Sequence, residues 1–173
     1  MSSTFKAIRN SEDQEVARLY SGDCIGVMEQ LSPDSIDLTV TSPPYDNLRT
    51  YKDSLEWDEG IWKQAIEGLY RVTKSGGVVV WVVGDATVKG SETGTSFKQA
   101  LYAMECGFNL YDTMIWNKAN SGSIGSLNRY ENVFEYMFVL SKGSPVSANI
   151  IKDRKNKRAG EIQSGSIRQS HGS

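Results

Sequence analysis

The chain has 173 residues, of which 39% are hydrophobic and 23% charged, and its formal net charge is −2. This length suits one domain with a substantial core, and the composition is that of an ordinary soluble globular protein. No apolar run approaches the roughly 20 residues that a membrane-spanning helix needs, and the N-terminus lacks the apolar core of a signal peptide. We therefore expect a cytoplasmic protein with no membrane partner.

The chain offers few residues for metal or histidine chemistry. Its two cysteines, Cys24 and Cys106, do not form a CxxC pair, and its one histidine, His171, lies near the C-terminus. Zinc sites and disulfide frameworks use closely spaced or numerous cysteines. We therefore predict no metal site, no disulfide framework and no histidine base.

The N-terminal third begins with a polar stretch and then alternates strand and helix. Residues 1–16 are polar and predict a loose lead-in. Residues 17–20 predict a short strand, and residues 23–30 predict a helix that Asp23 caps. The β-rich run at residues 36–41 predicts the next strand, because it is short and a turn precedes it.

Two prolines give that strand a stiff exit at Thr41-Ser42-Pro43-Pro44-Tyr45. Proline fixes its own φ and pushes the residue before it into extended geometry, so the chain leaves the sheet as a rigid rod. Neither proline donates an N–H, so the corner offers carbonyl acceptors, the Ser42 hydroxyl and the Tyr45 ring. A flat group that carries an amine suits such a corner, which points to a nucleobase.

The rest of the chain continues the alternation of helices and strands. An amphipathic pattern predicts a helix over 59–74, ended by Gly76-Gly77, and continuous hydrophobicity predicts a central covered strand over 78–83. The later elements expected are a helix at 96–105, a strand at 108–116, a polar loop at 117–131 and a strand at 133–140. This pattern predicts an α/β fold with a doubly wound, mostly parallel sheet.

Polar residues follow three of the predicted strands, at Gly22-Asp23, Ser42-Pro43-Pro44-Tyr45 and Gly84-Asp85. In doubly wound sheets, ligands bind beyond the carboxyl ends of the strands. The three sequences are therefore expected to meet at one edge of the sheet.

The acceptors at the Ser42 corner would change the reactivity of a base amine bound there. The amine is a poor nucleophile, because its lone pair is delocalised into the ring. Acceptors at its N–H groups, here the Ser42 hydroxyl and the Pro43 carbonyl, would localise that pair, and preorganised dipoles do so without reorganising. Tyr45 would stack on the face of the base. The structural alternative is a turn in which the prolines serve only to end the strand.

The same segments resemble the site-specific DNA amino-methyltransferases, which methylate N4 of cytosine or N6 of adenine with S-adenosylmethionine. The similarity spans residues 17–142 in the family's usual order. It rests on Leu19–Cys24, Leu31–Leu38, Ser42–Tyr45, Leu69–Gly77, Ile115–Lys118 and Arg129–Glu135. The resemblance implies the Rossmann-like methyltransferase fold, DNA as partner and S-adenosylmethionine as cofactor.

The resemblance also implies roles for individual residues. Catalytic roles fall on Ser42, Pro43, Pro44 and Tyr45, cofactor contacts on Asp23 and Thr41, and base or DNA contacts on Asp46, Asn47, Trp116, Lys118, Arg154 and Lys155. Each set has a structural alternative. Asp23 also suits a plain helix cap, Asp46 and Asn47 suit a turn, and Trp116 suits the core.

Residues 143–173 form a basic tail on an acidic body. Residues 150–173 carry net +4, so the first 149 residues carry net −6. Such a segment can neutralise phosphates in a salt-sensitive way. The alternative is a solvated, disordered terminus. In the family that the chain resembles, this region often begins the target-recognition segment.

The family's glycine loop, Phe-x-Gly-x-Gly, is absent from residues 1–173. One permuted arrangement of the family places the catalytic half first and the cofactor-loop half after the recognition segment. The chain matches that first half, so we expect an incomplete fold that is weakly active or inactive alone. The exposed edge and face of such a fold predict a homodimer or a complementary C-terminal half as partner.

The target base is left open by the sequence. Serine at the first position of the motif favours cytosine N4, although adenine enzymes also use it. Methylation of RNA or of protein amides uses related proline corners and is one alternative. A remnant that binds DNA without catalysis is another.

Overall fold

The computed structural model describes residues 4–46, 57–118 and 130–146. Asn47, Arg154 and Lys155 lie outside these ranges, as does most of the predicted polar loop. The elements are β1 (Thr4–Arg9), β2 (Glu15–Ser21), α1 (Cys24–Glu29), β3 (Ile36–Thr41), α2 (Glu59–Val72), β4 (Thr73–Val83), β5 (Thr87–Val88), β6 (Ser91–Glu92), α3 (Thr95–Glu105), β7 (Asn109–Asn117) and β8 (Phe134–Ser141). In these ranges no helix is long and apolar enough to cross a membrane.

The main sheet has four strands in the order β3-β4-β8-β7. β3 and β4 pair in parallel, and β8 is antiparallel to both of its neighbours, β4 and β7, so β7 runs in the same direction as β3 and β4. Three of the four described strands therefore share one direction, as the predicted mostly parallel sheet expects, and the sheet is mixed because β8 enters between β4 and β7 in the opposite direction. The predicted central position of residues 78–83 is confirmed, since β4 is paired on both sides.

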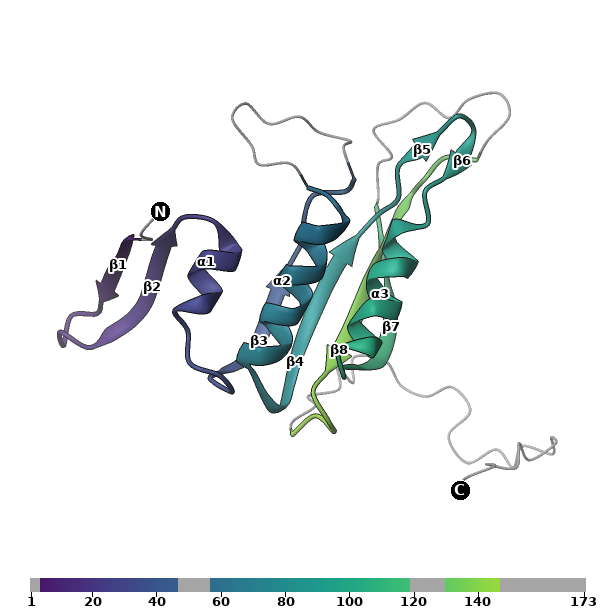
Figure 1. Cartoon of the computed structure of the whole chain (residues 1–173). Coiled ribbons are helices and arrows are strands. Elements are labelled where there is room, and N and C mark those ends of the chain that lie inside the picture. The colour runs from purple at the N-terminus through teal and green to yellow at the C-terminus, as the bar shows by residue number, and fades with distance from the viewer. Residues whose placement is uncertain (1–3, 47–56, 119–129, 147–173) are drawn as a thin grey trace, which may run out of the picture.

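Helices α2 and α3 both cover one face of this sheet (Figure 1). The apolar stripe of α2 supplies Trp62, Ile66 and Leu69 to the core, and Asp58 caps the helix by accepting from the Ile61 N–H at 2.9 Å. The sheet contributes alternate residues, chiefly Val79, Trp81, Val83, Phe138 and Leu140. Strand alternation thus sends every second side chain of β4 and β8 into one core.

The other face of the sheet carries apolar side chains that the described residues leave largely uncovered. Register places Leu38 and Val40 on this face beside Val78 and Val80, and Met114 beside Met137. Leu38 is 59% exposed, Val40 66% and Met114 50%. We call this surface the open face. The second helical layer of a doubly wound fold is not among the described residues.

The N-terminal region differs from the prediction. Thr4–Arg9 is a strand rather than a loose lead-in, and it pairs antiparallel with Glu15–Ser21. The side chain of Asn10 stabilises the turn by accepting from the Glu12 and Gln14 N–H groups. The predicted strand at residues 17–20 therefore exists, but it belongs to a separate hairpin that lies beyond α1 (Figure 1).

The junction between α2 and β4 also differs. The helix ends at Val72, and β4 begins at Thr73 without a linker. The predicted helix stop, Gly76-Gly77, lies inside the strand. Gly76 has a φ of +78°, which favours glycine, and a Cβ on Gly77 would lie 3.0 Å from the Asp37 carbonyl oxygen of β3. The two glycines therefore permit a close approach of backbones in the sheet.

The remaining predicted elements agree with the structure to within one or two residues. Asp23 caps α1, β3 spans Ile36–Thr41 as predicted, and α3, β7 and β8 have the predicted order. The short β5-β6 hairpin was not predicted, because its two-residue strands carry no periodic signal.

Candidate active site

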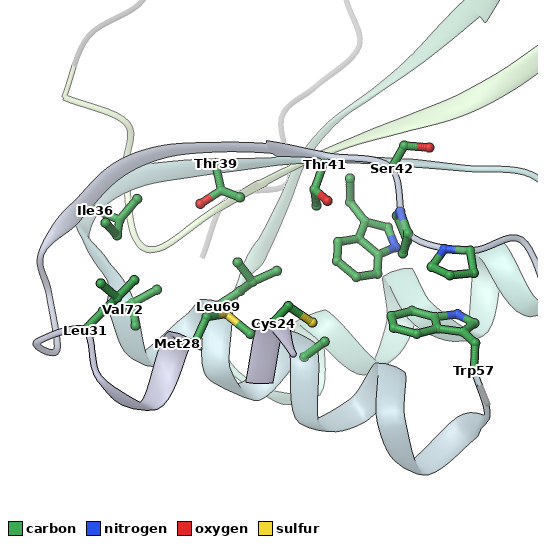
Figure 2. A pocket seen from close by; sticks show the side chains of 14 residues that line it. Cys24, Met28, Leu31, Ile36, Thr39, Thr41, Ser42, Trp57, Leu69 and Val72 are labelled. Atoms are coloured by element: carbon green, nitrogen blue, oxygen red, sulfur yellow. The ribbon is translucent and has the colours of Figure 1, made fainter. Parts of the chain in front are cut away.

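The proline corner leaves the carboxyl end of β3 with its side chains on alternating sides. Pro43 is buried, Ser42 and Pro44 are exposed, and Tyr45 is half-buried. The side chain of Thr41 points toward the helix layer, and that of Ser42 points away from it (Figure 2). The Ser42 hydroxyl therefore lies on the side of the open face, in the same alternation as Leu38 and Val40.

The Tyr45 phenol connects the corner to β8. Its Oη donates to Glu135 Oε2 at 2.6 Å and lies 2.9 Å from Ser42 Oγ. The edge of the ring approaches Gly84, where a Cβ would lie 3.5 Å from Tyr45 Cδ2. Contacts from the ends of β3, β4 and β8 thus fix the ring in one orientation.

Glu135 is a carboxylate in a strand that is otherwise almost entirely apolar. Its side chain is 13% exposed and forms an ion pair with Lys118 through Oε1. A carboxylate at this depth needs such a partner, because desolvation penalises an unpaired charge. Trp116 lies opposite Glu135 in the β7-β8 register and is 54% exposed. It therefore sits on the open face beside the corner rather than in the core.

A second polar network braces the corner against β4. Asp46, at a φ of +46°, accepts from the Ala86 N–H at 3.2 Å and from Thr93 Oγ1 at 2.7 Å. Asp85 accepts from the Ser96 N–H at 2.8 Å and from Ser96 Oγ at 2.6 Å. Asp46 is thus engaged in holding the loop, as the turn alternative for this residue expected.

Two of the three polar sequences predicted to meet at the strand ends do so. Ser42–Asp46 and Gly84-Asp85 lie together, because β3 and β4 are parallel neighbours. Gly22-Asp23 follows β2, which is not part of the main sheet. The Asp23 carboxylate caps α1 through Oδ1, which accepts from the Ile25 and Gly26 N–H groups at 3.0 and 3.3 Å.

A cavity of about 470 Å³ lies between β3 and the helices α1 and α2 (Figure 2). Thr39 and Thr41 point into it from β3, and among the described residues no charged side chain lines it. Trp57 Nε1, buried at its wall, finds no acceptor within the described part of the chain. Partial desolvation, and then the charge of Asp23, raise the pKa of the Cys24 thiol at the same wall.

The structure thus brings some of the predicted residues together and adds one contact residue that was not predicted. Among the described residues, Ser42 and Tyr45 are in contact, and Lys118 and Trp116 join them through Glu135. Thr41 faces the cavity on the other side of the strand, and Asp23 is at the start of α1. Glu135 was not predicted as a site residue. A lone acid in the run Phe-Glu-Tyr-Met-Phe-Val-Leu was the signal that could have found it.

Known proteins that are similar to this chain are DNA methylases. A profile of the DNA methylase family, of N6 and N4 methyltransferases, matches residues 36–171. The orphan methyltransferase M.BamHII of Bacillus amyloliquefaciens is 58% identical over 130 residues, which are 75% of this chain and 47% of M.BamHII. The type II methyltransferase M.BglII of Bacillus subtilis is 35% identical over 78 residues, 41% of this chain and 20% of M.BglII.

Solved structures share the fold. The PvuII DNA methyltransferase (cytosine-N4-specific) has a TM-score of 0.59 at 22% identity, over 72% of this chain and 49% of its own. A putative DNA modification methylase from Thermus thermophilus, complexed with S-adenosyl-L-methionine, has a TM-score of 0.52 at 23% identity. The match covers 80% of this chain and 56% of the methylase chain. The chain therefore spans about half, or less, of these relatives. Because the family profile covers most of its length, the chain belongs to the DNA methylase family of N6 and N4 amino-methyltransferases.

Proposed function

We propose that this chain carries the catalytic motif of a DNA methyltransferase that transfers a methyl group from S-adenosylmethionine to the exocyclic amine of a flipped cytosine or adenine. The contact of Ser42 with Tyr45, held by Glu135, carries the proposal. We favour cytosine N4, because serine occupies the first position of the motif. Methylation of RNA or protein amides and DNA binding without catalysis are the alternatives that the product and binding assays below separate.

The chemistry at the corner follows from acceptor placement. The Ser42 hydroxyl and the Pro43 carbonyl would accept the two N–H groups of the amine, which turns the nitrogen lone pair toward the methyl group. The Tyr45 ring would stack on the base, a contact worth about 1–3 kcal/mol. Extruding the base from the duplex costs a few kcal/mol, so stacking offsets much of that cost. In this proposal Pro44 stiffens the corner, and Trp116 and Lys118 flank the base.

S-adenosylmethionine, when bound, supplies a methyl group on a sulfonium that a neutral amine can attack. The cavity beside Thr41 fits only part of this molecule. Its apolar walls suit an adenosyl group, but its described lining offers no charge for the amino-acid end. Ser42 is among the residues that line the cavity, but its hydroxyl points away from the helices (Figure 2). The described residues therefore do not make a complete cofactor site, and contacts from Asp23 and Thr41 remain a prediction.

The functional test is methyl incorporation into DNA from labelled S-adenosylmethionine. We expect no transfer by the chain alone, and no micromolar S-adenosylmethionine binding in titration calorimetry, because the cofactor site is incomplete. Adding the half of M.BamHII that this chain does not cover should restore transfer. Digestion of the product to nucleosides then identifies N4-methylcytosine or N6-methyladenine.

Three other results would contradict the proposal or favour one of its alternatives. Transfer, or micromolar cofactor binding, by the isolated chain would contradict the proposed incompleteness. Salt-sensitive duplex binding with no transfer in the presence of the second half would favour a DNA-binding remnant. Methyl transfer to RNA or to protein, but not to DNA, would replace the proposed substrate.

The open face supports a second part of the proposal, that a complementary half or a second copy of the chain covers it. Leu38, Val40 and Met114 form an apolar surface there, and β3 has no strand partner on its outer edge among the described residues. Exposed apolar surfaces of this kind mark association sites. The relatives are about twice the length of the matched region, so a complementary half is the favoured occupant.

Val40→Lys should weaken association with the M.BamHII half at least tenfold, because it would place an unpaired charge in an apolar interface. Val16→Lys is the matched control, since Val16 is 59% exposed on the N-terminal hairpin, away from the main sheet. Light scattering measures both association with the half and self-association. A chain that stays monomeric at high concentration and binds no half would contradict this part of the proposal.

A further inference from the structure

The hydrogen bonds at the proline corner have a fixed direction, which the carboxylate sets. Glu135 forms an ion pair with Lys118, and a carboxylate can only accept, so Tyr45 must donate its one O–H proton to Glu135 Oε2. With that proton committed, the 2.9 Å contact between Ser42 and Tyr45 requires Ser42 to donate. The chain of donors therefore runs from Ser42 through Tyr45 to Glu135.

This direction determines what Ser42 offers to a ligand. A serine hydroxyl has one proton and two lone pairs. The proton points inward to Tyr45, so only the lone pairs remain for a group at the exposed side of Ser42. An amine N–H is matched by such an acceptor, whereas a carbonyl oxygen at the same place would meet another oxygen without a proton between them.

We propose that Glu135 is a specificity-determining residue, which makes the corner select bases that carry an exocyclic amine over bases that carry a carbonyl there. The inference rests on the proposed function, because it assumes that a base amine meets Ser42. Glu135 does not touch the base. It acts through Tyr45, as a positioning residue that fixes the orientation of two hydroxyl groups.

Lys118 makes this assignment open to a sharp test. Lysine has donors only, so it holds an oxygen at the Oε1 position. In Glu135→Gln the amide oxygen would stay on Lys118, and the amide N–H₂ would face Tyr45. Tyr45 would then accept from the amide and donate to Ser42, which frees the Ser42 proton to point at the ligand. The substitution keeps the shape of the side chain and reverses the direction of the two hydrogen bonds that link Ser42, Tyr45 and residue 135.

The test uses the 173-residue chain with 3-fluorotyrosine at position 45, so that ¹⁹F NMR reports occupancy of the corner without any methyl transfer. Deoxycytidine and deoxyuridine are titrated in parallel, and deoxyadenosine and deoxyinosine form a second pair. We expect the amino member of a pair to bind at least tenfold more tightly than its carbonyl analogue. In Glu135→Gln that ratio should fall to about one or invert. Glu12→Gln, in the exposed turn of the N-terminal hairpin, should leave the ratio unchanged.

The possible outcomes distinguish a failure of the role inferred for Glu135 from a failure of the proposed function. An unchanged ratio in Glu135→Gln would overturn the inference and leave the proposed function standing. Failure of the wild-type chain to bind any of the four nucleosides would count against the proposed function, and the inference would fall with it. Glu135→Ala provides a second variant, which should shift or broaden the wild-type fluorine signal before any ligand is added. An identical signal would show that Glu135 does not orient Tyr45.

Discussion

Ser42→Ala should lower the rate of methyl transfer by about 10²-fold in the chain assembled with its complementary half. It removes a preorganised polar group at the reacting nitrogen, and losing one such group costs roughly 10²–10³ in kcat. The KM for DNA should change little, because Tyr45 and the rest of the interface remain. Labelled methyl incorporation at saturating DNA measures the effect. Adding Tyr45→Ala should bring transfer to background.

The control for this loss is Ser91→Ala, on the short strand β6, where the hydroxyl donates to the neighbouring Glu92 carbonyl. It removes the same group from an exposed position away from the corner and should leave transfer unchanged. Undiminished turnover in Ser42→Ala would show that this hydroxyl does not assist methyl transfer. A rise in KM with unchanged kcat would reassign Ser42 to ground-state binding of the base.

Trp81→Ala should remove most of the stability of the chain. Trp81 is 2% exposed in the core, and its Nε1 donates to Gln99 Oε1 at 2.8 Å. Truncating a buried tryptophan costs about 3–5 kcal/mol, and the orphaned Gln99 oxygen adds about 1–3 kcal/mol. Domains are stable by only about 5–15 kcal/mol. Urea denaturation followed by circular dichroism measures the change in the free energy of unfolding.

Trp116→Ala is the matched control, because it truncates the same side chain on the open face. At 54% exposure its loss should cost well under 1 kcal/mol in the isolated chain. Adding Gln99→Leu to Trp81→Ala should recover part of the loss, since the orphaned amide is removed. Equal losses from Trp81→Ala and Trp116→Ala would contradict the uncovered open face and would indicate that a second copy buries it.

Local signals in the sequence predicted most elements and the corner. Continuous hydrophobicity placed the central strand, amphipathic spacing placed α2, and Asp23 marked the start of α1. Ser42 and Tyr45 were predictable because two prolines act on the backbone next to them. In each case the physical cause lies within a few residues of its effect.

Features that depend on distant contacts were not predictable in this way. The antiparallel entry of β8 follows from strand pairing across the fold, which hydrophobic periodicity does not encode. The role of Glu135 depends on a contact 90 residues away in the chain. The first strand was missed because Phe5 and Ile8 do not alternate in a strict period of two, and their hairpin packs too little to leave a burial pattern.

Because the side chains of Thr41 and Ser42 point to opposite sides, an insertion or deletion in this segment keeps the orientation of Ser42 only if it has an even number of residues. Deleting or inserting one residue between Ile36 and Ser42 would rotate the serine toward the helices and bring a threonine to the side of the open face. A change of two residues would preserve the orientation and only shift the corner along the strand. Length variation in natural or engineered versions of this segment should therefore occur in even steps, or outside the strand altogether.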